Sequence, residues 1–254
     1  MKNIVYGAIL ALQFLTRFPL PVNCSMDHKT LKWALRFYPF AGLAIGGILY
    51  LFYYLLNGLL PLYMLTLILL TLWVFLSGGL HLDGVMDVAD AVGSNGSTEK
   101  KIEILKDSRV GSFAVLIVIF LLLWKSVLLY AVLDSSENDL FIIAIPMMAR
   151  FQALLQLFFF HPFQSQGMAH YWKQHLSMLD VIIAACWLLP FAFTQVTLVI
   201  IIMFSLQICF SFIFGKWAVR HFQGINGDTV GASIEGAELW NLAVLCSLFL
   251  FGIV

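Results

Sequence analysis

Carboxylate side chains gather in two short stretches of the sequence. The first stretch, GGLHLDGVMDVADAVGS at 78–94, contains Asp83, Asp87 and Asp90. Their i, i+4, i+7 spacing places all three on one face of a helix, where like charges repel each other. A bound cation would stabilise them, and oxygen ligands in this number suit Mg²⁺. The alternative is a solvated face of a cytoplasmic helix, which the apolar neighbours of these acids disfavour.

A second acidic stretch lies farther along the chain. The segment GINGDTVGASIEGAEL at 224–239 carries three more carboxylates. Its glycines would let the backbone approach a phosphate closely, although tight packing between helices explains them equally well. We predict one Mg²⁺ site with ligands from both stretches. These are Asp83, Asp87, Asp90 and Asp228, followed by Glu235 and Glu238 as ligands or as supporting residues.

Basic side chains that suit phosphate groups lie between the two acidic stretches. In ILKDSRVGS at 104–112, Lys106 and Arg109 bracket Asp107. Arginine can bind a phosphate through two parallel hydrogen bonds, and lysine supplies a point charge. A cytoplasmic anchor that fixes the membrane topology is an equally good interpretation of this segment.

Two further arginines stand near or within apolar runs. Arg17 lies in QFLTRFPLP and Arg150 lies in PMMARFQALL. An arginine inside a membrane span marks a functional site by default, although an interhelical ion pair is the alternative for Arg150. We predict substrate contacts from both arginines and from four other residues, namely Lys106, Arg109, Asn226 and Thr229.

The sequence leaves the proton acceptor of such a site open. His81 precedes the first aspartate and can act as a general base, a metal ligand or an interfacial side chain. Asp107 is the other candidate base. The predicted catalytic group therefore comprises Asp83, Asp87, Asp107, His81 and Asp228.

The composition places these residues in a membrane protein. Hydrophobic residues make up 61% of the chain and charged residues 11%, whereas a soluble domain averages about 45–50% apolar and about 25% charged. The chain cannot cover a water-facing surface, which excludes an ordinary soluble enzyme, a disordered protein and a secreted disulfide scaffold. The net charge is zero, so no basic field attracts nucleic acid.

Continuous apolar runs predict an all-α, polytopic transmembrane helical bundle of about seven spans. A membrane barrel would alternate apolar and polar residues instead. The segment 3–16 is short and lies between Lys2 and Arg17, so we expect an interfacial or re-entrant helix, with a further crossing as the alternative. One catalytic domain covers residues 1–254. The predicted spans are 36–57, 61–80, 112–133, 139–160, 180–197, 198–219 and 238–254.

Basic residues predict the orientation of the bundle. Lysine and arginine gather in the connections 17–35 and 81–111 and flank the connection 220–237, whereas 134–138 reads DSSEN and has none. Basic connections stay in the cytoplasm. Both acidic stretches therefore lie on the cytoplasmic side.

Three classes of function fit this arrangement. They are an Mg²⁺-dependent enzyme of phosphoryl or nucleotidyl transfer, a cation or proton transporter that uses the acids as a relay, and a structural membrane subunit. A transporter predicts acids near the middle of the bilayer on broken helices. Here the acids lie at the edges of connections on one side, which favours the enzyme.

Five ordered motifs resemble those of the cobalamin synthase family, also called adenosylcobinamide-GDP ribazoletransferases. They are QFLTRFPLP, FYPFAGLAIGG, GGLHLDGVMDVADAVGS, LKDSRVGSFA and GINGDTVGASIEGAELWNL. The aspartate pattern also resembles that of CDP-alcohol phosphotransferases, a lipid-enzyme alternative. However, Asp83–Gly84 leads directly to Asp87 and Asp90, and the Ala-Arg of that signature is missing.

The first resemblance implies a reaction, a metal and a location. The family joins adenosylcobinamide-GDP to α-ribazole or its 5′-phosphate, which gives adenosylcobalamin or its phosphate and GMP. This is the last step of nucleotide-loop assembly in cobalamin biosynthesis. The family requires Mg²⁺ and is integral to the bacterial cytoplasmic (inner) membrane, in contact with the lipid bilayer. Whether the chain forms a homo-oligomer stays open.

Overall fold

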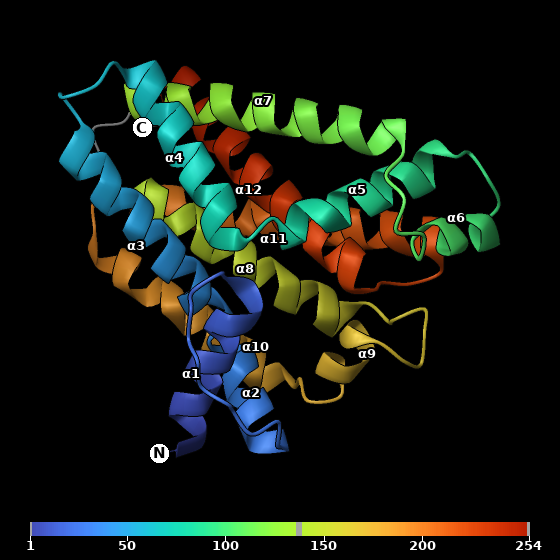
Figure 1. Cartoon of the computed structure of the whole chain (residues 1–254). Helices are drawn as coiled ribbons and strands as arrows, with labels where there is room; N and C mark the ends of the chain where they lie inside the picture. The colour runs from blue at the N-terminus through green and yellow to red at the C-terminus, as the bar shows by residue number, and fades with distance from the viewer. Residues whose placement is uncertain (1, 136–138, 253–254) are drawn as a thin grey trace.

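The protein is helical throughout the part of the chain that the computed structural model describes, residues 2–135 and 139–252 (Figure 1). No strand occurs in these residues, which confirms the predicted all-α class. A 3-10 helix (Cys186–Phe193) follows α10. The helices are α1 (Lys2–Leu15), α2 (His28–Arg36), α3 (Tyr38–Leu56), α4 (Leu62–Ser77), α5 (Leu80–Gly93), α6 (Thr98–Ile104), α7 (Ser112–Ser135), α8 (Leu140–Phe159), α9 (Met168–Lys173), α10 (Met178–Ala185), α11 (Thr197–Phe222) and α12 (Gly227–Leu250).

Five of the described helices are long and apolar enough to cross a membrane, namely α3, α7, α8, α11 and α12. The helices α4 and α5 meet at an angle of 87°. If they form one broken span, the number of crossings rises to six. The predicted count of seven is therefore not confirmed. The predicted span 180–197 consists of the short α10 and the 3-10 helix, and α1, with 14 residues, is shorter than the ~20 that a crossing needs.

The second acidic stretch is helical, which corrects the predicted connection 220–237. Helix α11 continues to Phe222, and α12 begins at Gly227. Only residues 223–226 join the two helices. Asp228, Glu235 and Glu238 therefore lie on one helix and not on a loop.

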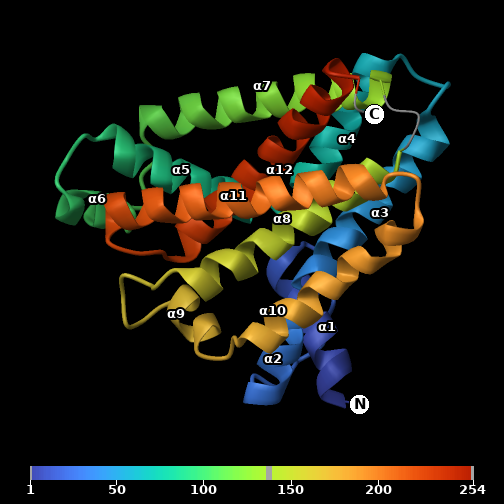
Figure 2. The same cartoon turned by 180° about the vertical axis from the view of Figure 1, so that it is seen from behind.

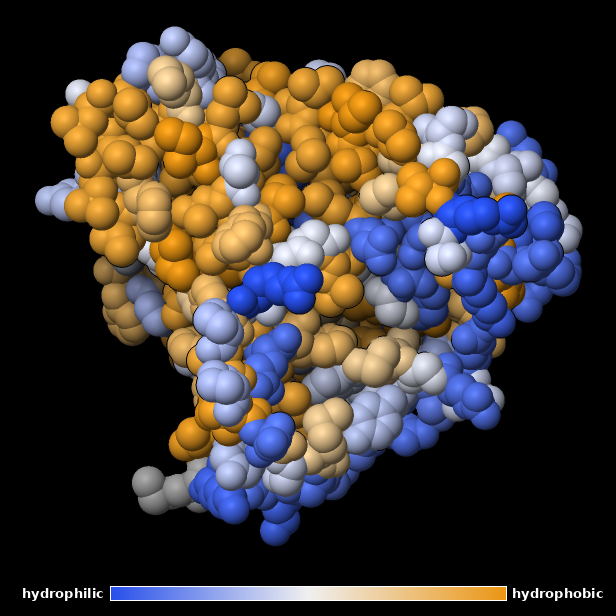
Figure 3. Space-filling model, in the orientation of Figure 1, coloured by the Kyte–Doolittle hydropathy of each residue, from blue (hydrophilic) through white to orange (hydrophobic). Residues whose placement is uncertain are grey.

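Helix α8 forms the centre of the bundle, since 89% of its apolar window is buried, against 17% for α7. Helices α10 and α11 lie on the face opposite α4 and α5 (Figure 2). Apolar side chains dominate the surface over α3, α4 and α7, whereas polar side chains gather toward α2, α6 and α9 (Figure 3). This division fits a membrane-embedded body with one polar end.

Helices α3 and α8 cross at close range because α3 carries glycine at the contact. A side chain at Gly42 would collide with the backbone of Pro146. One turn later, a Cβ at Gly46 would lie 2.6 Å from the Cα of Ile143. Small residues spaced by four let membrane helices approach in this way.

The bend between α4 and α5 follows from two consecutive glycines. Gly78 and Gly79 have φ angles of 71° and 68°, a left-handed conformation that residues with a Cβ adopt rarely. The chain turns sharply there, and the Arg17 N–H binds the Leu76 carbonyl oxygen at 2.8 Å beside the turn. The bend carries the first acidic stretch away from the axis of α4.

Candidate functional site

A cavity of about 210 Å³ opens where α5 and α12 begin. His81 and Asp83 of α5 and Asp228 of α12 lie in its wall. Apolar and aromatic residues from α1, α3, α8 and α9, together with further residues of α5 and α12, form the remainder. The structure thus brings residues from both acidic stretches to one cavity, as predicted.

Asp83 and Asp228 both lie near the N-terminus of a helix. Each lies in the first turn, where the helix dipole favours a negative charge and backbone N–H groups attract anions. The two helices touch at Gly84, because a Cβ there would lie 2.6 Å from the backbone oxygen of Asp228. The glycine that follows Asp83 therefore makes room for the start of α12.

Asn226 and Thr229 cap α12, and Asn226 also lines a cavity of about 230 Å³, so the substrate contacts expected of them stay a prediction. The Thr229 N–H donates to Asn226 Oδ1 at 2.9 Å, and the Asn226 N–H donates to Thr229 Oγ1 at 2.8 Å. This reciprocal pair satisfies donors that a helix start leaves free. Asn226 Nδ2 also donates to Asp228 Oδ2 at 2.7 Å, so the cap orients the cavity carboxylate.

The aspartates of the two stretches lie within electrostatic range of each other. Asp87 is subject to the charges of Asp228, Asp83 and Asp90. Among the described residues, no lysine or arginine forms an ion pair with Asp83, Asp87 or Asp228. A bound divalent cation would balance this excess of negative charge.

The described residues contain no group of three or more acidic, histidine or cysteine side chains close enough to enclose a metal. Magnesium does not need such a cage, since it usually binds through one or two carboxylates together with substrate phosphates and water. Asp83 and Asp228 in the wall of one cavity fit this pattern.

Asp90 has another partner, which argues against its predicted role as a metal ligand. Its two carboxylate oxygens accept the N–H groups of Gly111 at 2.6 Å and Ala114 at 2.9 Å. These donors lie at the start of α7, so Asp90 caps that helix from α5. A Cβ at Gly111 would lie 2.5 Å from Asp90 Oδ1, and glycine is needed for the approach.

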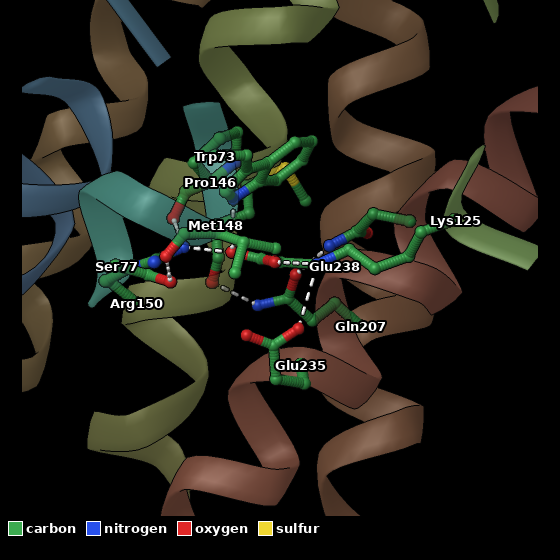
Figure 4. A network of polar contacts seen from close by, with 11 residues as sticks. Trp73, Ser77, Lys125, Pro146, Met148, Arg150, Gln207, Glu235 and Glu238 are labelled. Atoms are coloured by element: carbon green, nitrogen blue, oxygen red, sulfur yellow. Dashed lines mark hydrogen bonds and ion pairs between the residues drawn. The ribbon is translucent and has the colours of Figure 1, made fainter. Parts of the chain in front are cut away.

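Glu235 and Glu238 belong to a buried ion cluster and are not among the residues that line the cavity (Figure 4). Lys125 Nζ donates to Glu235 Oε2 at 2.9 Å and to Glu238 Oε2. Glu238 also accepts from Arg150 and, at 2.9 Å, from Trp73 Nε1. Both glutamates are almost fully buried, and these cations already balance their charge. The geometry therefore argues against Glu235 and Glu238 as metal ligands.

Arg150 belongs to this cluster and is not among the residues that line the cavity, so it forms the interhelical ion pair that was the alternative to a substrate contact. Its side chain is fully buried and pairs with Glu238 of α12. Sequence analysis missed Lys125, which is 1% exposed. The available signal was a single lysine inside an apolar span. Placing a charged side chain in the membrane costs free energy, so such a residue needs a partner.

Arg17 borders a second cavity, of about 400 Å³, which adjoins the first. Gly78 and Gly79 line this cavity with Arg17, and Asp83 lines both. The arginine side chain lies against Gly78, where a Cβ would collide with it. A guanidinium beside the N-terminus of α5 forms a favourable place for a phosphate.

A third hollow, of about 230 Å³, adjoins the first on the other side. Met168, Gly227 and Asp228 line both spaces. The first cavity thus shares lining residues with each of the other two, and Asp83 and Asp228 are among them. We call these three adjoining cavities the groove. A groove of this form suits an extended, multi-part substrate.

The segment with Lys106, Asp107 and Arg109 does not contribute to the cavity. Asp107 and Arg109 pair with each other at 2.6 Å, and the arginine side chain is 88% exposed. Hydrogen bonds from Arg109 lower the pKa of Asp107 to about 2. A paired carboxylate outside the cavity is poorly placed to act as the general base, whereas His81 lines the cavity.

Three buried polar atoms at the cavity have no hydrogen-bond partner in the described part of the chain. They are Tyr38 Oη, His81 Nδ1 and Trp172 Nε1. Sequence analysis singled out only His81. The other two come from α3 and α9, and no spacing in the sequence connects them.

Comparison with known proteins identifies the family of the chain. The family model for cobalamin-5-phosphate synthase matches residues 7–246. An adenosylcobinamide-GDP ribazoletransferase of Halalkalibacterium halodurans is 36% identical over 98% of both chains. One from Acinetobacter baumannii is 35% identical over 90% of this chain and 92% of its own. No solved structure matches. The chain therefore belongs to the cobalamin-5-phosphate synthase family.

Proposed function

We propose that this protein transfers the cobinamide phosphate of adenosylcobinamide-GDP to α-ribazole or its 5′-phosphate. The products are adenosylcobalamin, or its 5′-phosphate, and GMP. Family membership over nearly the whole chain supports the reaction. The observation that carries the mechanism is the meeting of Asp83 and Asp228 in one cavity.

The reaction exchanges one phosphorus–oxygen bond for another. A ribose hydroxyl of the ribazole attacks the phosphorus nearer the cobinamide, and the bond from that phosphorus to the bridging oxygen breaks. GMP leaves with the bridging oxygen. The proton of the hydroxyl passes to a base at the cavity, and His81 is the candidate that the geometry favours.

Mg²⁺ is the cofactor that the carboxylates fit best. Asp83 and Asp228 would hold it, with Asp87 close enough to add negative charge. When bound, Mg²⁺ neutralises charge on the diphosphate and polarises the phosphorus. The protein itself contributes the placement of both carboxylates, through the helix starts and the cap from Asn226.

Arg17 is the basic residue best placed to bind phosphate. It shares the second cavity with Asp83 and with Gly79 and Leu80 at the start of α5. A positive side chain there would stabilise the departing GMP. Lys106 and Arg109, which lie outside the cavity, have no such position.

We also propose a location and an orientation. The lysine and arginine distribution favours the bacterial cytoplasmic membrane with the groove open to the cytoplasm. Both substrates are water-soluble products of cytoplasmic chemistry, so this orientation gives them access to the groove. The apolar surface over α3, α4 and α7 would contact lipid.

A direct assay tests the proposed reaction. Purified protein in lipid nanodiscs is incubated with adenosylcobinamide-GDP and α-ribazole, and GMP is measured by chromatography. We expect one GMP for each cobalamin, no GMP without α-ribazole, loss of turnover with a chelator and recovery with Mg²⁺. Folded protein that releases no GMP with all components present would contradict the proposal.

A further inference from the structure

We propose that the aromatic end of the 210 Å³ cavity binds the fused two-ring base of α-ribazole. The inference rests on the proposed function and adds a position for one substrate. It starts from the unpartnered polar atoms of Tyr38, His81 and Trp172. It then adds the shape and size of the cavity around them.

Three polar side chains at this cavity are deeply buried, with Tyr38 1%, Trp172 2% and His81 3% exposed. In the described part of the chain, their polar atoms Oη, Nε1 and Nδ1 have no hydrogen-bond partner. Burying a polar group without a partner costs free energy, so such groups are normally satisfied. All three residues line one cavity, and we take a ligand that enters it as the partner that completes these hydrogen bonds.

Aromatic rings form one corner of the same cavity. The ring centroids of Phe14 and Trp172 are 5.1 Å apart, and those of Tyr38 and Trp172 are 5.7 Å apart in an edge-to-face arrangement. Leu15 and Leu157 extend the apolar wall. A flat, weakly polar ring packs favourably against such a surface.

The volume of the cavity limits its occupant. Pockets that enclose a complete drug-sized ligand measure about 300–1,000 Å³, and this cavity measures about 210 Å³. It therefore admits one ring system and not a corrinoid. The larger parts of the other substrate must lie in the adjoining groove.

The base of α-ribazole, 5,6-dimethylbenzimidazole, matches this chemistry. It is neutral and mostly apolar, and its one free ring nitrogen accepts a hydrogen bond. Trp172 Nε1 can only donate, and Tyr38 Oη can donate or accept. A guanine would instead bring several donors and acceptors against the apolar wall, where they would stay unpaired.

The orientation of such a base agrees with the reaction. His81 lies in the same wall as Asp83 and Asp228. A base held in the aromatic corner would direct its ribose toward these carboxylates. The attacking hydroxyl would then meet both the candidate proton acceptor and the phosphorus.

Two conservative variants test the inference, Trp172→Phe and Tyr38→Phe. Each keeps a ring and removes the hydrogen-bonding atom. We expect the KM for α-ribazole to rise about tenfold in Trp172→Phe and the KM for adenosylcobinamide-GDP to stay the same. Trp240→Phe is the matched control, because its indole N–H is also unpartnered among the described residues and its ring packs on Phe210 outside the cavity.

A binding measurement keeps the inference testable if turnover is lost. We expect α-ribazole alone to quench tryptophan fluorescence in the natural protein and in Trp240→Phe, and to quench it far less in Trp172→Phe. GMP, which carries the base of the other substrate, should not quench. Three outcomes would overturn the inference. The first is quenching by GMP instead of α-ribazole, and the second is quenching by a change of lipid or detergent but not by α-ribazole. The third is that neither KM changes.

The two proposals fail in different ways. If the proposed function is wrong, the natural protein releases no GMP under any condition. If only the position of the base is wrong, the natural protein releases GMP normally and the KM for α-ribazole stays the same in Trp172→Phe.

Discussion

The Cα of Gly84 faces the backbone oxygen of Asp228 across the contact between α5 and α12. A Cβ at Gly84 would lie 2.6 Å from that oxygen and 3.0 Å from the Asp228 Cα. Because Asp83 is the neighbour of Gly84, this contact fixes the separation of the two carboxylates that line the cavity. The HLDG and GDT motifs thus meet through their backbones.

We expect Gly84→Ala to reduce GMP release at least tenfold. Alanine would normally favour the helix by up to about 1 kcal/mol, but here the added methyl group must move α12 and with it Asp228. Overpacking of this kind costs about 1–3 kcal/mol. Melting temperature and turnover of the purified protein measure both effects.

Gly47→Ala serves as the control, because nothing lies within 4 Å of a Cβ built at Gly47 on α3. It should keep full activity and an equal or higher melting temperature. If Gly84→Ala behaved like Gly47→Ala, the contact between Gly84 and Asp228 would not be important for the position of the carboxylates.

We expect Asp83→Asn and Asp228→Asn each to lower turnover by several orders of magnitude while the protein still inserts and folds. Each substitution keeps the shape of the side chain and removes a charge that would balance Mg²⁺. The Mg²⁺ concentration for half-maximal residual activity should rise. Asp134→Asn, on the exposed end of α7, is the control and should change neither quantity. Normal GMP release from both cavity variants would refute the metal assignment.

The membrane class and most helices were predictable from the sequence because apolar runs of span length form a signal along the chain itself. The sharp bend after α4 was not predicted, because the predicted span 61–80 runs through it. The paired Gly78 and Gly79 were the missed signal. The start of α12 was also missed, because the polar GINGDTVG segment suggests a loop although Asn226 caps a helix there.

The partners of the carboxylates were less predictable. Glu238 meets Lys125 across 113 residues of sequence and Arg150 across 88. Spacing within one segment cannot reveal which of several acids finds a distant cation. It therefore grouped Glu238 with Asp228, although tertiary packing turns the first to a buried ion cluster and the second to the cavity.

We expect Glu238→Gln to destabilise the protein more than Glu235→Gln. Glu238 accepts hydrogen bonds from Lys125, Arg150 and Trp73, whereas Lys125 is the only donor to the Glu235 carboxylate among residues 2–135 and 139–252. Removing one partner of a buried ion pair costs about 3–5 kcal/mol, since a charge is left uncompensated. The melting temperatures of the two variants in detergent show which one is less stable.

Two further observations complete this test. Glu103→Gln removes an exposed ion pair with Lys100 and should have almost no effect. At a temperature where the variants are folded, the Mg²⁺ requirement of Glu235→Gln should match that of the natural protein. A clear increase in this requirement would restore the glutamate as a metal ligand.

We expect Asp107→Asn to retain GMP release and to leave the pH dependence of kcat/KM unchanged. Hydrogen bonds from Arg109 lower the pKa of Asp107 to about 2, so its carboxylate stays ionised at every pH above roughly 3. It therefore cannot produce a titration between pH 5 and 9, and any loss of activity as the pH falls through that range belongs to another group. Profiles of kcat/KM for the natural protein and the variant, recorded over the same range, provide the comparison. An acidic limb that disappears in Asp107→Asn would identify Asp107 as the base after all and would require its loop to reach the cavity.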